Sequence, residues 1–199
     1  AHVVAVEKLG IPILLGNKEI INGKIDELHF KRTEFEIRDP KQCPKHSFYA
    51  NELFNKRNRK GVTRKEAEYL VKQSNYYGSM LVSLDEADAL IGGLTTHYPQ
   101  TIKPALQCVG VKNEGDVVCG LYIVIIKRKI FFFADATVNI SPDANTLSKI
   151  AITVADTVKT YDIDPKVAML SFSNFGSVVH PETEKVKEAV KIVKKLRPD

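Results

Sequence analysis

Residues 130–157 read IFFFADATVNISPDANTLSKIAITVADT, and residues 164–177 read DPKVAMLSFSNFGS. In each stretch an apolar run stops abruptly at polar residues, and helical spacing follows the first run. Strands that alternate with helices build parallel or mixed sheets, and ligands of such folds bind outside the carboxyl ends of the strands. The two stretches therefore predict an α/β fold with a small-molecule site that contains an anion. The residues expected to cluster there are Asp135, Asn139, Ser171, Ser173, Asn174 and Ser177.

The flanking sequence supplies the helices that this pattern needs. Ser141 and Pro142 predict an N-cap and a first-turn proline, and an apolar face then repeats at helical spacing up to residue 158. Residues 167–170 form the continuous apolar run of a buried strand. Pro181 begins a last helix, whose lysine-rich face we expect to be solvated.

Shorter signals extend the α/β pattern through the rest of the chain. Thr63 and Glu66 predict a capping box at the start of a helix that runs through Val71. Other helices are predicted at residues 1–9, 48–54, 78–84 and 102–106. Strands are predicted at residues 11–15, 35–37 and 89–91, with a hairpin of residues 117–126 and 130–133. The expected architecture is three-layered, with helices on both faces of a mostly parallel, mixed sheet.

The composition is that of an ordinary globular protein. Of the 199 residues, 44% are hydrophobic and 27% are charged, which argues against a disordered or fibrous chain. The longest apolar run, residues 121–126, is far shorter than the roughly 20 residues of a membrane-spanning helix. No positively charged and then apolar leader is recognisable. We therefore expect a protein that is neither secreted nor inserted in a membrane.

Cysteine and charge patterns narrow the class further. Cys43, Cys108 and Cys119 are odd in number and widely spaced, which favours reduced thiols in the cytoplasm over a disulfide framework or a zinc site. The histidines also lack metal-ligand spacing. The net charge of +5 lies mainly in local runs, without the stacking aromatic residues of a nucleic-acid surface. We expect no metal and no nucleic-acid partner.

Taken alone, the polar clusters leave functional and structural interpretations open. The 171–177 turn can bind an anion before a helix, or it can be a plain connection of turn-prone residues. Asp135 can orient a ligand or a neighbouring loop, or it can satisfy backbone amides. His97 can be an acid–base group or an ordinary loop histidine. In each case the spacing alone favours the structural interpretation.

A basic run has the same ambiguity. Arginine offers phosphate a two-pronged fork, although a solvated basic face is the commoner explanation of such a run. The residues concerned are Lys56, Arg57, Arg59 and Lys60.

Six motifs in a fixed order resemble one known family. They are IPILLGN (residues 11–17), RKGVTRKEAEYLV (59–71), YYGSMLVSLDEADALIGG (76–93), TIKPALQ (101–107), FADATVNISPDANTLSKIAI (133–152) and DPKVAMLSFSNFGS (164–177). Together they resemble the phosphate acetyltransferase (phosphotransacetylase) family over nearly the whole chain. Two details are most similar to the phosphotransacetylase-like C-terminal domain of bacterial NADP-dependent malic enzymes. These details are THYPQTIKPALQ (96–107), in place of a His-Ser-Thr type sequence, and SNFGS (173–177), in place of Ser-Thr-x-Gly-Ser.

The chain also departs from the family pattern. Lys103 stands where active acetyltransferases carry an arginine, so charge is kept but the bidentate fork is lost. Arg57 matches the other phosphate-side arginine of the family. By the same resemblance, the catalytic Ser-Arg pair and its acidic base would follow residue 199, and a first strand would precede residue 1. The sequence thus resembles a fragment that lacks elements at both ends.

The resemblance implies a phosphotransacetylase or isopropylmalate-dehydrogenase-like fold of two lobes with a ligand cleft, assembled as a homodimer or a higher homo-oligomer. The lobes would be residues 1–112, incomplete at the N-terminus, and residues 113–199, incomplete at the C-terminus. The implied cleft residues, none of them catalytic, are Arg57, His97, Lys103, Asp135, Asn139, Ser171, Ser173, Asn174, Gly176 and Ser177.

Three functional hypotheses follow from the resemblance. The first is a non-catalytic, acetyl-CoA-sensing and dimerisation module of an NADP-dependent malic enzyme, whose upstream domain would bind NADP, malate and a divalent metal. The second is an active phosphate acetyltransferase, which converts acetyl-CoA and phosphate to acetyl phosphate and CoA. The third is a dimerisation scaffold without a ligand. In the first two, the small-molecule ligand is acetyl-CoA, CoA or acetyl phosphate.

Overall fold

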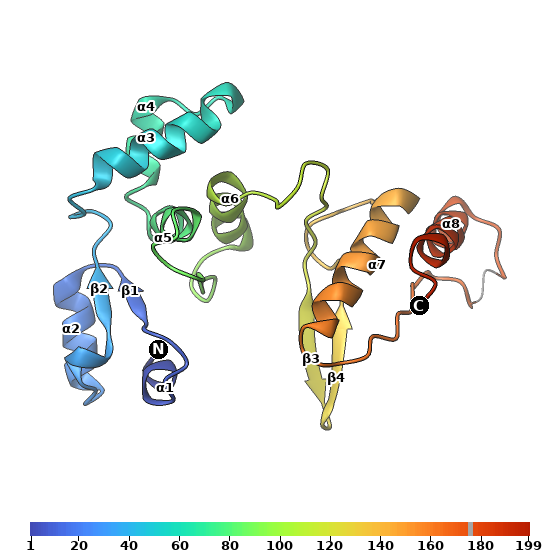
Figure 1. The fold of residues 1–199 in the computed structure, drawn as a ribbon, viewed down its shortest axis with the longest axis horizontal. Coiled ribbons are helices and arrows are strands. Elements are labelled where there is room, and N and C mark those ends of the chain that lie inside the picture. Colours follow the sequence, from blue (N-terminus) through green and yellow to red (C-terminus); the bar gives the residue numbers. More distant parts are fainter. Residues whose placement is uncertain (175–176) are drawn as a thin grey trace. The chain divides into compact units, whose positions relative to one another are not determined.

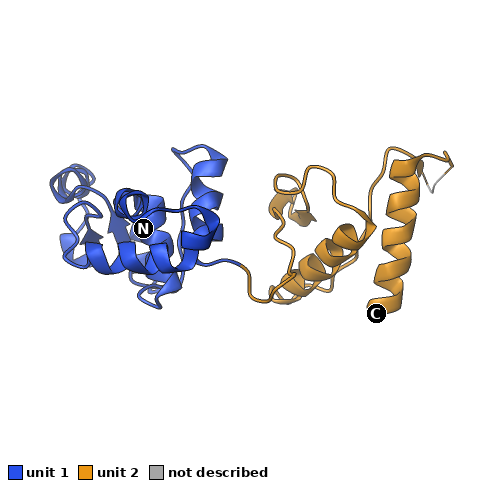
Figure 2. Cartoon of the chain, turned by 90° about the horizontal axis from the view of Figure 1, so that it is seen from above, with its two compact units in different colours: residues 1–110 blue, residues 111–199 orange. Residues whose placement is uncertain are grey.

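The structure is a computed structural model that describes residues 1–174 and 177–199. The chain forms two compact units, residues 1–110 (unit 1) and residues 111–199 (unit 2), as Figure 2 shows. Helices and short sheets occur in both units, which confirms the α/β class. Whether the units are the two lobes of a ligand cleft, divided at residues 112 and 113, stays a prediction.

Unit 1 begins with a small parallel sheet (Figure 1). After the short helix α1 (His2–Val6), strand β1 (Ile13–Leu15) pairs in parallel with β2 (Glu36–Arg38), so that Leu14 lies opposite Ile37. The crossover contains α2 (Lys18–Glu27) and a 3₁₀ turn, Arg32–Glu34. Asn17 starts α2 because its side-chain oxygen accepts a hydrogen bond from the backbone N–H of Ile20 at 2.9 Å.

Four helices enclose the core of unit 1. They are α3 (His46–Arg57), α4 (Arg64–Leu70), α5 (Ser74–Ser83) and α6 (Tyr98–Cys108), with a 3₁₀ turn, Asn58–Lys60, after α3. Leu53 and Met80 are fully buried between them. Tyr49 packs edge-on against Tyr77, with ring centroids 5.5 Å apart. The predicted cap of α4 is confirmed, because the Thr63 hydroxyl accepts from the Glu66 backbone N–H at 3.2 Å.

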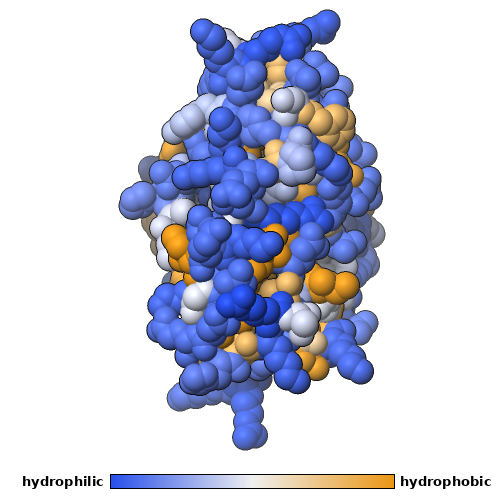
Figure 3. Space-filling view, turned by 90° about the vertical axis from the view of Figure 1, so that its left-hand side faces the viewer, coloured by the Kyte–Doolittle hydropathy of each residue, from blue (hydrophilic) through white to orange (hydrophobic). Residues whose placement is uncertain are grey.

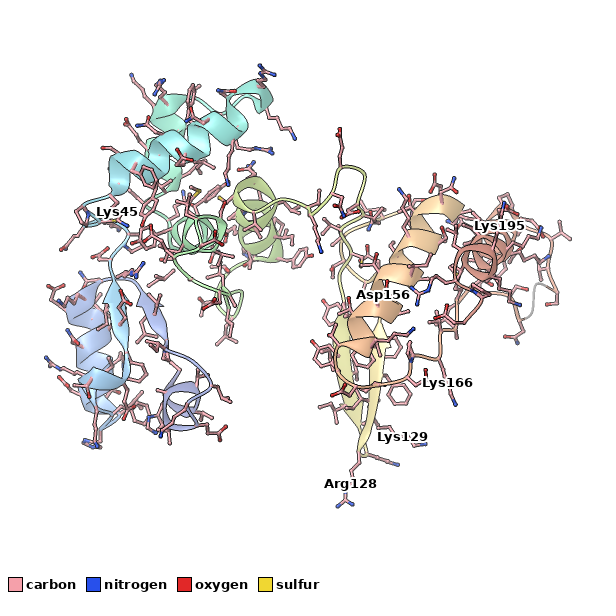
Figure 4. The ribbon with its side chains drawn as sticks, in the orientation of Figure 1. Lys45, Arg128, Lys129, Asp156, Lys166 and Lys195 are labelled. Carbon is pink, nitrogen blue, oxygen red and sulfur yellow. The ribbon has the colours of Figure 1, made fainter. Side chains whose placement is uncertain are left out.

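A charged cluster closes one side of this core. The Tyr49 hydroxyl donates to the carboxylate of Glu86, with 3.0 Å to each oxygen, and Lys45 donates to the same carboxylate at 3.1 Å. Burial and the Glu86 charge together raise the pKa of Tyr49 to about 12. The segment that follows α5 is thereby attached to the start of α3, where Figure 4 labels Lys45.

Unit 2 combines one hairpin with two long helices. Strands β3 (Tyr122–Ile126) and β4 (Lys129–Phe133) are antiparallel, as predicted, and Ile126 lies opposite Lys129. Lys127 and Arg128 form a two-residue turn with φ values of 46° and 67°, which matches the twist of the strands. The basic side chains at this tip extend away from the strands (Figure 4).

Helices α7 (Ala144–Lys159) and α8 (Pro181–Leu196) pack against each other in unit 2. Arg197 joins them by donating to Asp156 of α7 at 2.7 Å. The predicted cap of α7 at Ser141 is wrong. Asp143 caps the helix instead, because its carboxylate accepts from the Thr146 backbone N–H at 2.7 Å, so the helix begins two residues later.

Two predicted strands do not form. Residues 89–91 and 167–170 have no strand assignment, and Ile91 and Leu170 are largely exposed. A strand needs a hydrogen-bonded neighbour, and over the described ranges the only ladders are β1 with β2 and β3 with β4. The predicted three-layer, mostly parallel sheet is therefore not seen in the described part of the chain, which contains two separate two-stranded sheets.

Two further findings concern membrane-spanning helices and the surface. Among the described residues, no helix has both the length and the apolar character needed to cross a membrane. Figure 3 shows a face on which hydrophilic residues predominate and apolar residues lie in small, separate groups. That face offers no continuous apolar patch of the kind that marks a docking surface.

We predict opposite effects of alanine at two glycines that both face open space. Gly23 lies inside α2 with ordinary helical backbone, so Gly23→Ala should raise the free energy of unfolding by about 0.5–1 kcal/mol. Gly61 has a φ of 91°, so Gly61→Ala should lower the free energy by about 1 kcal/mol or more. Urea denaturation of both variants checks this pair, and equal effects would contradict the backbone argument.

Candidate functional site

The loop after β4 is organised around the Asp135 carboxylate. One oxygen, Oδ1, accepts from the backbone N–H groups of Gly120 at 2.9 Å, Thr137 at 3.0 Å and Val138 at 3.1 Å. The other oxygen, Oδ2, accepts from the backbone N–H of Asn139 at 2.8 Å and from its side-chain amide. Asn139 also donates to the Val118 carbonyl at 2.9 Å, so the loop is joined to the segment before β3.

This arrangement decides what Asp135 can do chemically. Burial disfavours its charge, but the hydrogen bonds from Thr137, Gly120, Val138 and Asn139 outweigh burial and lower the pKa of Asp135 to about 2. A carboxylate with so low a pKa, and with both oxygens already accepting, is a poor general base at neutral pH. The geometry therefore supports the structural interpretation, in which Asp135 satisfies backbone amides and shapes the loop.

The 171–177 turn is held by its own serines. The Ser171 hydroxyl donates to the Ser173 carbonyl at 2.9 Å, and the hydroxyls of Ser173 and Ser177 lie 3.2 Å apart. The Ser173 hydroxyl also accepts from the Val178 backbone N–H at 3.1 Å. Asn174 accepts through its carbonyl from the Ser177 N–H at 3.0 Å. Gly176, the remaining predicted cleft residue of this turn, lies outside the described residues.

The start of α8 is poorly suited to an anion. The His180 ring accepts from the Glu182 backbone N–H at 3.2 Å, and the Thr183 hydroxyl accepts from the His180 N–H at 3.1 Å. Pro181 has no N–H, and Glu182 and Glu184 place negative charge in the first turn. The helix end is thus capped by its own side chains, three residues beyond Ser177.

A cavity of about 820 Å³ in unit 2 brings the two polar clusters onto one lining. Asp135, Asn139 and Ser171 all contribute to it. Most of its wall is apolar and comes from β4, from one face of α7 and from the extended run 167–170. Ser173, Asn174 and Ser177 are not part of the lining. The cavity can take a small molecule, but its apolar wall and the excess of carboxylates (Asp135, Asp164 and Glu182) over lysines (Lys166 and Lys185) on its lining do not favour an anion.

The predicted site residues of unit 1 lie on or beside α3 and α6. Arg57 is the last residue of α3, and its Nε atom is buried without a hydrogen-bond partner. Ser79 of α5 is 1% exposed, and its hydroxyl likewise has no partner. Arg57 is thus a half-buried cation at the end of α3.

His97 and Lys103 are both exposed on α6. His97 precedes the helix as its N-cap residue, without a side-chain capping bond, and Lys103 lies in the middle of the helix. Helix α6 packs against both α3 and α5, which places Lys103 and Arg57 on neighbouring helices of unit 1. The predicted set thus divides into a unit 1 group and a unit 2 group.

Two cysteines near these sites are shielded from solvent, Cys108 fully and Cys119 in part. No cluster of three potential metal ligands occurs among the residues that the structure describes. Burial raises the pKa of the Cys108 thiol to about 11, against the opposing charges of Lys56 and Arg57. Burial and the nearby charge of Asp135 also raise the pKa of the Cys119 thiol. Neither thiol is poised to act as a thiolate nucleophile at neutral pH.

Sequence reasoning missed two contributors to these sites, Gly120 and Ser79, and named a third, Lys56, only as a residue that could hold a phosphate. Gly120 donates to Asp135, and a Cβ at this glycine would lie 2.2 Å from the Thr137 hydroxyl oxygen. Ser79 holds the unpartnered hydroxyl, and Lys56 contacts α5 and α6. The basic run signalled Lys56 only in general terms, and no local pattern marks Gly120 or Ser79, because their roles depend on residues distant in the sequence.

Comparison with known proteins gives a consistent result over the full chain. The sequence profile of the family described as "Phosphate acetyl/butaryl transferase" matches residues 1–199. A phosphate acetyltransferase of Bacillus subtilis is 37% identical over 98% of this chain and 60% of the relative. The crystal structure of a phosphotransacetylase from Streptococcus pyogenes matches with a TM-score of 0.88 at 32% identity, over 98% of this chain and 60% of that one.

An NADP-dependent malic enzyme of Escherichia coli is also similar. It is 31% identical over 96% of this chain, which covers 26% of that protein. The chain spans about 60% of the length of the Bacillus subtilis acetyltransferase. Since the acetyltransferase identity is higher, the comparisons favour the acetyltransferase hypothesis over the malic-enzyme hypothesis.

We predict that Asp135→Asn destabilises the protein in a pH-dependent way. The folded pKa of about 2 lies below the ordinary value of 3.8, so the charged carboxylate stabilises the fold above about pH 4. The substitution should cost about 2 kcal/mol of unfolding free energy at pH 7. The difference from the wild-type protein should shrink as the pH falls towards 2.

Urea denaturation at a series of pH values measures this difference. Asp164→Asn is the matched control, because Asp164 is an exposed carboxylate on the same cavity lining and no hydrogen bond or ion pair involves it in the described structure. A cost that is equal for both variants, or independent of pH, would refute the role of the Asp135 charge.

Proposed function

The chain belongs to the phosphate acetyl/butaryl transferase family, and from this premise we propose that the protein containing it transfers an acetyl group between coenzyme A and phosphate. The observation that carries the proposal is the family match over residues 1–199, together with 37% identity to a phosphate acetyltransferase. The reaction joins a phosphate oxygen to the thioester carbonyl carbon, breaks the carbon–sulfur bond and returns a proton to the CoA sulfur. Acetyl phosphate and CoA are the products.

Such a transfer needs cations that hold the phosphate and neutralise the charge that develops on it. Arg57 is suited to this role, because its guanidinium offers several donors in a planar fork at the end of α3. Lys103 would add a second positive charge from α6, although as a point charge rather than a fork.

The unit 2 residues would shape the cleft rather than react. Asp135 and Asn139 hold the loop after β4 through backbone hydrogen bonds, and the serines of the 171–177 turn hold that turn. We place the general base for the CoA thiol outside these groups, because the pKa of Asp135 is about 2 and its oxygens are occupied. No cofactor other than the CoA substrate enters this proposal.

The proposal also includes the expected lobes, sheet, oligomeric state and location of the complete protein. Units 1 and 2 would be the two lobes of the ligand cleft, and the exposed run 167–170 would become a strand of a larger, mostly parallel sheet in the complete protein. The protein would assemble as a homodimer or a higher homo-oligomer. The three cysteines are unbridged, which supports the expected cytoplasmic location.

A second candidate function is the acetyl-CoA-sensing, non-catalytic domain of an NADP-dependent malic enzyme. The observation that favours it is 31% identity to such an enzyme over 96% of this chain. In that setting NADP and a divalent metal would belong to an upstream dehydrogenase domain. The two functions share acetyl-CoA as the ligand and differ in whether phosphate is a substrate.

Turnover of the complete protein tests the proposed function. We expect formation of acetyl-CoA from acetyl phosphate and CoA, followed by the thioester absorbance. Arg57→Lys keeps the charge but removes the fork, and it should raise the KM for acetyl phosphate about tenfold or more. Arg59→Lys, two residues away and exposed, is the control and should resemble the wild-type protein.

The second candidate gives a different result. An inactive wild-type protein whose parent chain changes its malate turnover when acetyl-CoA is added would overturn acetyl transfer and support sensing. If neither acetyl transfer nor acetyl-CoA binding by calorimetry is detected, the ligand-free scaffold remains.

A further inference from the structure

The C-terminal ends of three helices of unit 1 meet at the side chain of Lys56. Lys56 lies in the last turn of α3, Ser83 is the last residue of α5, and Cys108 is the last residue of α6. The Lys56 ammonium donates to the Cys108 carbonyl oxygen at 3.0 Å and to the Ser83 hydroxyl. The Ser83 hydroxyl donates to the same Cys108 carbonyl at 2.8 Å. One side chain therefore joins the C-terminal ends of three helices.

The physical chemistry of helix ends favours this contact. The last carbonyl groups of a helix have no partner within the helix and carry partial negative charge, so an ammonium group beside them is stabilising. Cys108 is only 2% exposed, whereas Lys56 is exposed, so the ammonium covers the shielded end of α6 from the solvent side. Its hydrogen bonds to the ends of two other helices distinguish Lys56 from a freely solvated surface lysine.

The Lys56 contact also affects the next residue, Arg57. Arg57 directly follows Lys56 in α3. The contacts of Lys56 with Ser83 and Cys108 therefore also hold the stretch of backbone from which the Arg57 side chain extends. Arg57 ends helix α3, which packs against α6. The buried Arg57 Nε forms no hydrogen bond in the described structure. The position of the Arg57 fork therefore depends on how α3 is held against α6.

We propose that Lys56 is a positioning residue, which clamps the end of α3 to the ends of α5 and α6 and so sets the Arg57 guanidinium for a phosphate group. This inference rests on the proposed function, since it assigns phosphate to Arg57. Lys56 itself does not touch the substrate. Two of its three N–H donors are used by Ser83 and Cys108, and the basic run thus divides into one structural cation and one ligand-binding cation.

The experiment uses the complete protein and two variants of similar side-chain length. Lys56→Met removes the ammonium, and Lys65→Met removes an exposed ammonium from α4 for which the described structure shows no partner. Because a small displacement of a binding group weakens its interaction strongly, Lys56→Met should raise the KM for phosphate about tenfold. The KM for acetyl-CoA and kcat per folded molecule should stay within about twofold of the wild-type values.

A second measurement does not depend on acetyl transfer. Iodoacetamide labelling of Cys108, located by peptide mass mapping, reports how often the end of α6 opens. Lys56→Met should speed this labelling about fivefold or more, since local opening becomes easier once the clamp is lost. Lys56→Arg can still donate to the Cys108 carbonyl. Its KM for phosphate and its rate of Cys108 labelling should therefore lie close to those of the wild-type protein. Lys65→Met should change neither.

The outcomes separate the two proposals. Wild-type labelling and a wild-type phosphate KM in Lys56→Met would overturn the clamp. A lower melting temperature and a smaller active fraction, with an unchanged phosphate KM, would show a structural lysine and would also overturn the positioning role. If the wild-type protein transfers no acetyl group, the proposed function fails, and labelling of Cys108 at the wild-type rate in Lys56→Met then refutes the clamp independently.

Discussion

The Asp135 carboxylate is the interaction on which the loops of unit 2 depend. Three backbone N–H groups share one of its oxygens, and Asn139 supplies both donors to the other. Because Gly120 lies before β3 and residues 137–139 follow β4, one side chain holds both open ends of the hairpin. A two-stranded hairpin is marginal in isolation, and an ionised group that accepts several hydrogen bonds compensates for the missing neighbours.

Unit 1 uses charge in the same way, at the edges of an apolar core. Glu86 accepts from Tyr49 and Lys45 beside the start of α3, and Lys56 holds the end of the same helix. Helix α3 is therefore tied at both ends to residues that follow or end α5. The helix carries Arg57 at its last position, so these contacts give a defined position to the residue that we propose to bind phosphate.

Structural features that depend on neighbouring residues could be predicted from the sequence, whereas features that depend on long-range contacts could not. The Thr63 cap, the hairpin and the helix from Pro181 each depend on residues within a few positions, and each is confirmed. The exposed run 167–170 reads as a buried strand, but a strand forms only where another backbone pairs with it. The sequence marks Asp135 as a polar residue after a strand, while its partner Gly120 is 15 residues away and carries no signal of its own.

The choice between the two candidate functions comes down to phosphate. Both functions bind acetyl-CoA, whose own phosphate groups also attract cations, so the presence of a cation alone does not separate them. Inorganic phosphate does separate them, because acetyl transfer needs cations that neutralise the charge developing on that phosphate, whereas a sensor does not use it as a substrate. Arg57 offers a two-pronged guanidinium at the end of α3, while Lys103 offers only a point charge in the middle of α6. The kinetic response to phosphate, rather than the affinity for acetyl-CoA, therefore decides between the two functions.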